Sequence, residues 1–257
     1  MKIAISGKGG VGKTTLMALL ANQLKNAGKE VLIIDADPSP HMAQTIGIKN
    51  IEKITPIAEM TSLLAERSGK TAGSPFYQIN PQVDDLLEKY MVEQDGVRLM
   101  VLGAIQTGDG GCACPENTVL RRLMTKLLLS PSQMVLLDME AGVEHLGRGT
   151  IAGVDHLLIA VTPTRSSVRT AKKITKLARE VGIPKVSFVG NLVQDKDDEL
   201  FLSEALGQTP VVFYPDHAAI RKAERTGKPI TQVAPQLEEI TRDLIDYLLG
   251  RQKESDK

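Results

Sequence analysis

A glycine-rich stretch close to the N-terminus combines the residue types that phosphate binding requires. Residues 7–15 read GKGGVGKTT, after an apolar run and before a helical pattern. Glycines let backbone N–H groups curl around phosphate oxygens, a lysine reaches the outer phosphates, and a threonine hydroxyl can ligate Mg²⁺. A glycine-rich turn that binds nothing is the alternative, but the complete GxxxxGKT pattern in this context favours a nucleotide. The residues expected to contact it are Gly9, Gly10, Val11, Gly12, Lys13, Thr14 and Thr15, with Thr14 on magnesium.

Carboxylates end two of the apolar runs. EVLIID leads into Asp35 and Asp37, and MVLLD ends in Asp138. Ligands gather at the carboxyl ends of strands in doubly wound folds, where carboxylates can hold Mg²⁺ and orient an attacking water. A carboxylate at a strand end or helix cap is common and often has no function. Two such strand ends at the same sheet edge as a phosphate-binding loop favour a functional role. The sequence therefore predicts a Mg²⁺-dependent phosphoryl-transfer site.

Both cysteines of the chain lie one residue apart, in GGCACPEN. In an extended segment, the side chains of Cys112 and Cys114 point to the same side. Two thiolates make an incomplete site, whereas four would suit zinc, nickel or an iron–sulfur cluster. A two-fold dimer with this loop at its interface would supply four. Two small hydrophobic residues in a buried turn are the alternative, but the flanking glycines and proline favour an exposed loop.

The elements that must position these groups follow a regular alternation. Val-, Ile- and Leu-rich runs alternate with helical patterns, the first near 13–27, which predicts an α/β fold with a doubly wound, mostly parallel sheet. Residues 1–250 are expected to form one domain, with an irregular excursion near 51–96 carrying short helices such as 56–67. A charged flexible tail follows at 251–257. The final helix, 236–249, has an apolar face that we expect to pack on the core.

Composition excludes several classes of partner. Lys plus Arg and Asp plus Glu number 31 each, Trp is absent, and four Phe and four Tyr leave few platforms for stacking bases. We therefore expect no nucleic-acid partner. No apolar run approaches the roughly 20 residues of a membrane span, and the N-terminus enters a strand pattern at once. A cytoplasmic protein without membrane contact is predicted, in which thiols stay reduced.

As a whole, GKGGVGKTT resembles the deviant Walker A motif of the MinD/ParA/nitrogenase-iron-protein class of P-loop ATPases. The resemblance implies that Lys8 crosses a dimer interface to the partner chain's nucleotide, so that nucleotide drives homodimerisation. It also implies a switch I role in hydrolysis for Asp37 and a Walker B role on the Mg²⁺ shell for Asp138. ATP hydrolysis to ADP and phosphate is the implied reaction, with Lys8, Lys13, Asp37 and Asp138 as catalytic residues.

The same resemblance implies where the base lies. Asn191 ends the run KVSFVGN, and in the class an asparagine at this place reads adenine. The loop at Pro215 and Asp216 would pack on the base, which favours ATP over GTP. From the residues alone, all three could equally be turn formers.

Longer stretches narrow the resemblance. GGCACPENTVLRRLM, DMEAGVEHLGRGT, DPSPHMAQTIG and YPDHAAIRKAERTGKPI look like the CooC-type nickel-insertion ATPases, accessory proteins of carbon monoxide dehydrogenase and of the related acetyl-CoA synthase. This implies ATP-dependent nickel delivery to such a client, with Ni²⁺ held by Cys112 and Cys114 of two chains. Because zinc lies near nickel in the affinity order, Zn²⁺ binding in vitro is also expected.

Two further hypotheses remain open from the sequence. An iron–sulfur reductase resembling nitrogenase iron protein would take cluster ligands from two separated places in each chain, whereas both thiols here lie in one loop. A ParA/MinD-like positioning ATPase would bind DNA or membrane without a metal, which the neutral charge disfavours. His145, past the second carboxylate run, is interpreted as a structural histidine, and Met139 and Met60 as core residues.

Overall fold

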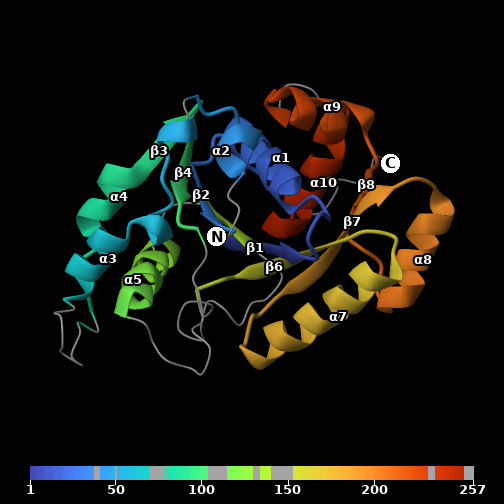
Figure 1. The fold of residues 1–257 in the computed structure, drawn as a ribbon. Coiled ribbons are helices and arrows are strands. Elements are labelled where there is room, and N and C mark those ends of the chain that lie inside the picture. The colour runs from blue at the N-terminus through green and yellow to red at the C-terminus, as the bar shows by residue number, and fades with distance from the viewer. Residues whose placement is uncertain are drawn as a thin grey trace.

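The computed structural model describes residues 1–37, 41–49, 51–69, 78, 80–103, 115–129, 134–139, 153–230 and 235–251. An eight-stranded sheet runs through them in the order β3-β4-β2-β5-β1-β6-β7-β8 (Figure 1). Every pairing is parallel except that of β3 with β4. The strands are β1 Lys2–Gly7, β2 Val31–Ala36, β3 Met91–Gln94, β4 Val97–Val101, β5 Met134–Met139, β6 His156–Val161, β7 Val186–Val193 and β8 Phe213–Pro215.

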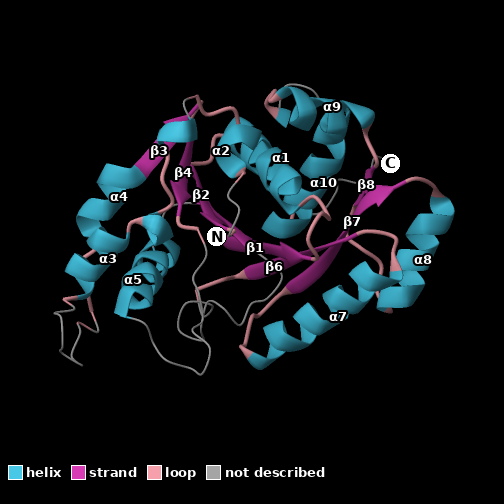
Figure 2. Cartoon of the chain, viewed as in Figure 1, coloured by secondary structure: helices cyan, strands magenta, loops and turns pink. Residues whose placement is uncertain are grey.

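Helices cover both faces of the sheet (Figure 2). They are α1 Lys13–Asn26, α2 Met42–Thr45, α3 Thr61–Ser68, α4 Asp84–Tyr90, α5 Pro115–Leu129, α7 Arg165–Glu180, α8 Lys196–Leu206, α9 Ala218–Thr226 and α10 Glu238–Leu249. Short 3-10 helices span Ile51–Lys53, Ile57–Glu59 and Pro235–Leu237. None of the described helices is long and apolar enough to cross a membrane.

Alternation along each strand divides the core into two layers. Ile3 and Ile33 face the layer that contains the apolar residues of α1 and α10. Ala4 and Leu32 face the other layer, with those of α3, α5 and α7. Because both faces are buried, the central strands are apolar at most positions, which explains the Val, Ile and Leu runs. The exceptions include Asp35 and Asp138, which lie near the carboxyl ends of β2 and β5. The predicted fold class, a doubly wound and mostly parallel sheet, is confirmed.

The described part of the region near 51–96 is more regular than expected. Besides α3 and α4 it contains β3, whose pairing with β4 makes it an edge strand of the main sheet. The predicted helix 56–67 corresponds to a 3-10 turn and α3. The predicted core packing of the final helix is confirmed, because Leu244, Ile245 and Leu248 of α10 are buried. Met139 is also buried in the core, as predicted, while a single ATPase domain over 1–250 stays a prediction.

Candidate nucleotide site

The glycine-rich loop joins the central strand β1 to the N-terminus of α1. Gly10 and Gly12 have left-handed φ angles of 78° and 84°, which residues other than glycine rarely adopt. Gly12 is the N-cap of α1 and provides no side chain that could accept from the first-turn N–H groups. Those donors stay available for phosphate oxygens, as an anion site at a helix N-terminus requires. Lys13, the first residue of α1, is 8% exposed.

Asn191 braces this loop from the end of β7. Its side-chain Nδ2 donates a hydrogen bond of 2.7 Å to the carbonyl oxygen of Val11. A Cβ atom on Gly12 would lie 2.3 Å from the same Nδ2, so the absence of a side chain at Gly12 permits the contact. Pro215 lies beside Val193 at the end of β8. These residues therefore gather at the edge of the sheet that holds the glycine-rich loop.

The backbone of the neighbouring Asp216 donates to the carbonyl oxygen of Val193 at 3.1 Å. The Asp216 side chain forms an ion pair with Arg221 of α9. Both interactions anchor the start of the loop between β8 and α9 close to the end of β7. All three residues predicted to surround a base thus lie at one sheet edge.

Thr14 and Asp138 form the polar centre of the site. The Thr14 hydroxyl donates to Asp138 Oδ2 at 2.8 Å. The other carboxylate oxygen, Oδ1, is buried without a hydrogen-bond partner among the described residues. A buried carboxylate oxygen is normally partnered, and a hydroxyl beside a carboxylate is the oxygen set that Mg²⁺ prefers. The pair is therefore suited to hold Mg²⁺, which when bound neutralises phosphate charge.

Two buried carboxylates lie together at this edge. Burial raises the pKa of Asp138 to about 7, and the negative charge of Asp35 adds to the rise, while Thr14 and Lys13 oppose it. Burial also raises the pKa of Asp35 to about 6, against two backbone hydrogen bonds. Desolvation therefore dominates both groups. A cation placed between phosphate and Asp138 would favour the ionised carboxylate.

Asp35 fixes the backbone around Asp37. Its Oδ1 accepts from the Asp37 N–H at 3.3 Å, and its Oδ2 accepts from the Met42 N–H at 3.2 Å. These bonds hold the end of β2 and the start of α2 on one buried carboxylate. Asp37 itself is half-buried at the same edge. Asp35 thus has a positioning role that the sequence did not assign.

A cavity of about 420 Å³ opens beside the glycine-rich loop. Its other walls come from α2 and from α9 with the segment that follows it. Gly47 and Pro229 bring these walls together, since a Cβ on Gly47 would lie 2.5 Å from the Pro229 side chain. These walls were not predicted from the sequence, although DPSPHMAQTIG and GKPI contain the glycine and proline that meet. The lining residues are Gly10, Gly12, Lys13, Thr14, Thr15, His41, Gln44, Thr45, Ala223, Gly227, Lys228 and Ile230.

The second lysine of the loop, Lys8, is exposed and points to α7. Its Nζ donates to the hydroxyl oxygen of Ser166 at 3.1 Å. Gly9, the neighbouring glycine, is also exposed, and nothing lies within 4 Å of the position that a Cβ would take. In one chain, therefore, Lys8 contacts the first turn of α7.

The thiol pair lies outside the described residues, as does His145. Within the described ranges, no group of three or more His, Cys, Asp or Glu side chains is arranged to hold a metal ion. The helix α5 begins at Pro115, the residue directly after Cys114. It belongs to the core layer below the sheet, where Leu120 and Leu123 are buried. The predicted metal ligands therefore immediately precede a well-packed helix.

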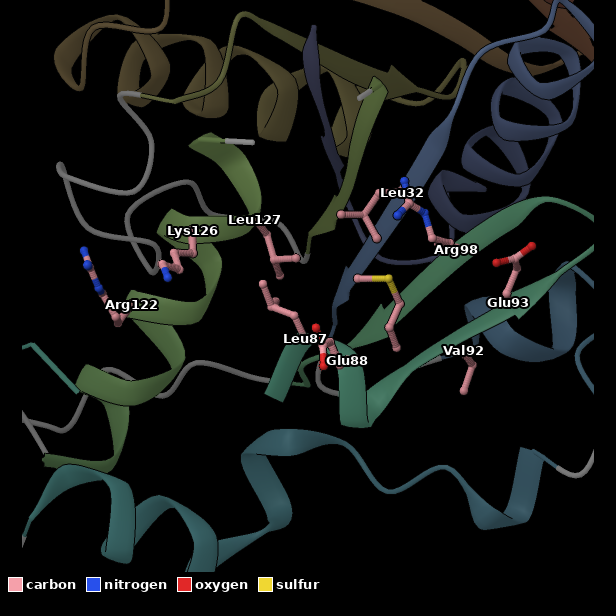
Figure 3. A pocket seen from close by; sticks show the side chains of 10 residues that line it. Leu32, Leu87, Glu88, Val92, Glu93, Arg98, Arg122, Lys126 and Leu127 are labelled. Carbon is pink, nitrogen blue, oxygen red and sulfur yellow. The ribbon is translucent and has the colours of Figure 1, made fainter. Parts of the chain in front are cut away.

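A second cavity, of about 670 Å³, contains none of the predicted site residues. It lies between α4, β3 and the C-terminal half of α5, over the start of β2 (Figure 3). Leu32, Leu87 and Leu127 provide an apolar floor, while Arg98 and Glu93 belong to its mixed-charge rim. It is at the sheet edge opposite the glycine-rich loop.

Comparison with known proteins agrees with this geometry. The family model described as CobQ/CobB/MinD/ParA nucleotide binding domain matches residues 2–230. The chain belongs to this family. Carbon monoxide dehydrogenase accessory protein CooC of Rhodospirillum rubrum is 38% identical over 256 residues, covering 98% of this chain and 97% of that protein. An uncharacterized ATP-binding protein of Methanocaldococcus jannaschii is 39% identical over 254 residues, or 97% and 98% of the two chains.

Solved structures of the same family share the fold. MinD of Pyrococcus horikoshii, complexed with Mg-ADP, has a TM-score of 0.67 at 19% identity, covering 98% of this chain and 100% of that one. The MinD cell division protein in complex with MinC, from Aquifex aeolicus, gives 0.70 at 21% identity, covering 100% and 98%. At such identities the likeness concerns the fold. Together with the relatives above, it confirms the predicted CooC-type, MinD/ParA-class P-loop ATPase.

Proposed function

We propose that this MinD/ParA-type ATPase is a nickel chaperone that binds Ni²⁺ between two chains and supports its insertion into carbon monoxide dehydrogenase or acetyl-CoA synthase. The observation that carries the proposal is the 38% identity with CooC, a carbon monoxide dehydrogenase accessory protein, over nearly the whole of both chains. The matched stretch spans 98% of this chain and so extends far beyond the P-loop that the whole class shares. A shared fold alone would not assign such a function.

Nucleotide chemistry would be performed at the edge of the sheet near β1. Lys13 and the N–H groups of the loop bind the phosphates, and Thr14 with Asp138 holds Mg²⁺, in keeping with their hydrogen bond and the unpartnered Oδ1. Asp37, fixed by Asp35, orients the attacking water. Positioning and electrostatic stabilisation account for most of the catalysis of phosphoryl transfer, which suits a site built on a rigid strand and helix end.

Adenine recognition would use the residues around the end of β7. Asn191 keeps its side-chain oxygen available while its Nδ2 binds Val11, so it can still accept from an exocyclic amine. Pro215 and Asp216 would pack along the base. Lys8 would leave Ser166 and reach the nucleotide of a second chain, which makes the homodimer the ATP-bound form.

Nickel would be held by four thiolates, Cys112 and Cys114 from each chain. A soft thiolate set in this number suits nickel in a square plane. Because Pro115 starts a packed helix, movement of α5 on dimerisation would carry the thiol pair with it. Closing the dimer on ATP and assembling the metal site would then be one event.

Equilibrium dialysis against Ni²⁺ tests the proposal. The wild-type protein should bind about one Ni²⁺ per two chains, because one four-thiolate site needs both copies. Cys112→Ser and Cys114→Ser should each abolish this binding. Lys13→Ala should remove ATP hydrolysis while leaving the thiols themselves unchanged, so dialysis of this variant shows whether nickel binding needs the nucleotide. Unaltered nickel binding in both cysteine variants would show that the metal is held by other residues.

A further inference from the structure

The outward face of α7 carries a stripe of positive charge. All six basic residues of the helix are exposed, and apart from the adjacent Lys172 and Lys173 they follow one another at spacings of three and four residues. At 100° per residue they fall within an arc of about 120°, so they form one continuous face. Glu180 is the only carboxylate of the helix. The basic stripe consists of Arg165, Arg169, Lys172, Lys173, Lys176 and Arg179.

The opposite face of α7 explains why the stripe points outward. Val168, Ala171, Ile174 and Ala178 are buried, and the helix packs against β1, β6 and α8. In Figure 1, α7 lies along one border of the molecule. The stripe is therefore presented to solvent along a helix about 24 Å long, at 1.5 Å per residue.

A solvent-exposed helix face does not need a continuous row of positive charges in order to be hydrated. Like charges three and four residues apart destabilise a helix, and a solvated face usually mixes both signs. Among the described residues, the one ion pair of the stripe joins Lys176 and Glu180 at 3.9 Å. The chain as a whole is neutral, so the excess on α7 is local. A helix that retains this repulsion is typical of an electrostatic docking surface.

We propose that the basic stripe docks an acidic surface of a protein partner. The inference rests on the proposed function, and the partner it names is the nickel enzyme that receives the metal. A protein fits better than a nucleic acid because α8, packed beside α7, is acidic. A phosphate backbone following the stripe would also meet this acidic neighbour, whereas a folded protein can oppose a basic and an acidic patch side by side. The acidic residues are Asp195, Asp197, Asp198, Glu199 and Glu204.

The stripe also starts at the nucleotide site. Ser166 in the first turn of α7 accepts from Lys8 of the glycine-rich loop. The N-cap, Thr164, accepts from the Ser167 N–H at 3.3 Å and fixes this turn. When Lys8 leaves Ser166 for a phosphate, the end of the docking helix loses a contact. The state of the nucleotide is thereby connected to the surface that meets the partner.

A charge-reversal variant tests the stripe. Arg169→Glu/Lys172→Glu/Lys176→Glu places three carboxylates on it at positions where glutamate is a good helix former. The matched control, Lys29→Glu/Lys49→Glu/Lys53→Glu, changes the net charge equally at exposed positions outside α7. Surface plasmon resonance measures the binding of each protein to immobilised, nickel-free carbon monoxide dehydrogenase at 50 and 300 mM NaCl. ATP hydrolysis and nickel dialysis are measured on the same preparations.

We expect the stripe variant to bind the client at least about tenfold more weakly, mainly through a slower association rate, and the control to bind like the wild type. High salt should weaken the wild type and have little effect on the stripe variant. Both variants should retain ATP hydrolysis and nickel binding. Equal client binding by wild type and stripe variant overturns the inference and leaves the chaperone function standing.

Two other outcomes also decide against it. If the wild type fails to bind or activate the client, the proposed function fails, and the docking inference fails with it. A 30-base-pair DNA duplex serves as the second probe. Retardation of this duplex by the wild type but not by the stripe variant, with client binding unchanged in both, would assign the stripe to nucleic acid instead.

Discussion

Gly12→Ala should destabilise the glycine-rich loop through two separate effects. The first is backbone strain, because Gly12 has a φ of 84° and a side chain in this region costs about 1 kcal/mol. The second is steric, because the new Cβ would lie 2.3 Å from Asn191 Nδ2. The amide must retreat, and its 2.7 Å bond to the Val11 carbonyl is then lost, at a further cost of about 1 kcal/mol or more. The free energy of unfolding should therefore fall by about 2–3 kcal/mol.

The loop supplies its own control. Gly10 has nearly the same φ, 78°, but nothing lies within 4 Å of its Cβ position. Gly10→Ala therefore carries the backbone strain alone and should lower the free energy of unfolding by about 1 kcal/mol. Urea denaturation of the nucleotide-free proteins compares the two variants directly. Equal destabilisation by both would refute the role assigned to the Asn191 contact.

A double-mutant cycle separates the steric effect further. Asn191→Ala removes the bond to Val11 and should cost about 1 kcal/mol. In Gly12→Ala/Asn191→Ala the clash is absent and the same bond is lost only once. The double variant should therefore be about 1 kcal/mol more stable than the sum of the single effects predicts. Simple additivity would show that the alanine at 12 acts without touching Asn191.

Two further predictions concern polar groups that are half-buried or buried, Thr14 and His156. Thr14→Val removes the hydroxyl that binds Asp138, so Mg²⁺-dependent ATP hydrolysis should fall at least about tenfold. Thr14→Ser restores a hydroxyl and should restore hydrolysis. Full activity in the valine variant would show that Thr14 is not a magnesium ligand. Burial, with the charge of Lys185, lowers the pKa of His156 below 6.5. As pH falls, the His156 imidazole is therefore protonated in the unfolded chain before it is protonated in the folded protein. Wild type should therefore lose stability relative to His156→Phe between pH 7.5 and 5.5, by up to about 1.4 kcal/mol per pH unit. Parallel stability curves in urea would contradict this.

The strands that are buried on both faces could be predicted from the sequence. Seven runs of Val, Ile and Leu correspond to seven strands, because a strand covered on both faces is apolar at most of its positions. The strand β3 was missed since its residues are half-buried or exposed and include Glu93 and Gln94. An edge strand needs no continuous apolar run, so its pattern is too weak to stand out.

The residues of the site likewise divide into those that local sequence predicts and those that it does not. The glycine-rich loop and the strand-end carboxylates follow from local sequence, because one strand and one turn determine them. The walls from α2 and the segment after α9 meet only through tertiary packing, of which Gly47 against Pro229 is the contact. The basic stripe of α7 was hidden for another reason. Its charges cancel against acidic residues elsewhere in a sum over the chain, and only the helix geometry gathers them on one face.

The position of β1 in the sheet has a consequence for synthesis. This first strand lies between β5 and β6, so its neighbours reach from residue 134 to 161, and the cavity beside its loop is completed by residues as late as Ile230. Pairings over such separations form slowly. On the ribosome, therefore, GKGGVGKTT emerges long before anything can hold it in shape. A product of interrupted translation would retain the whole phosphate-binding sequence yet lack the site, and the growing chain cannot capture ATP until nearly all of it has been made.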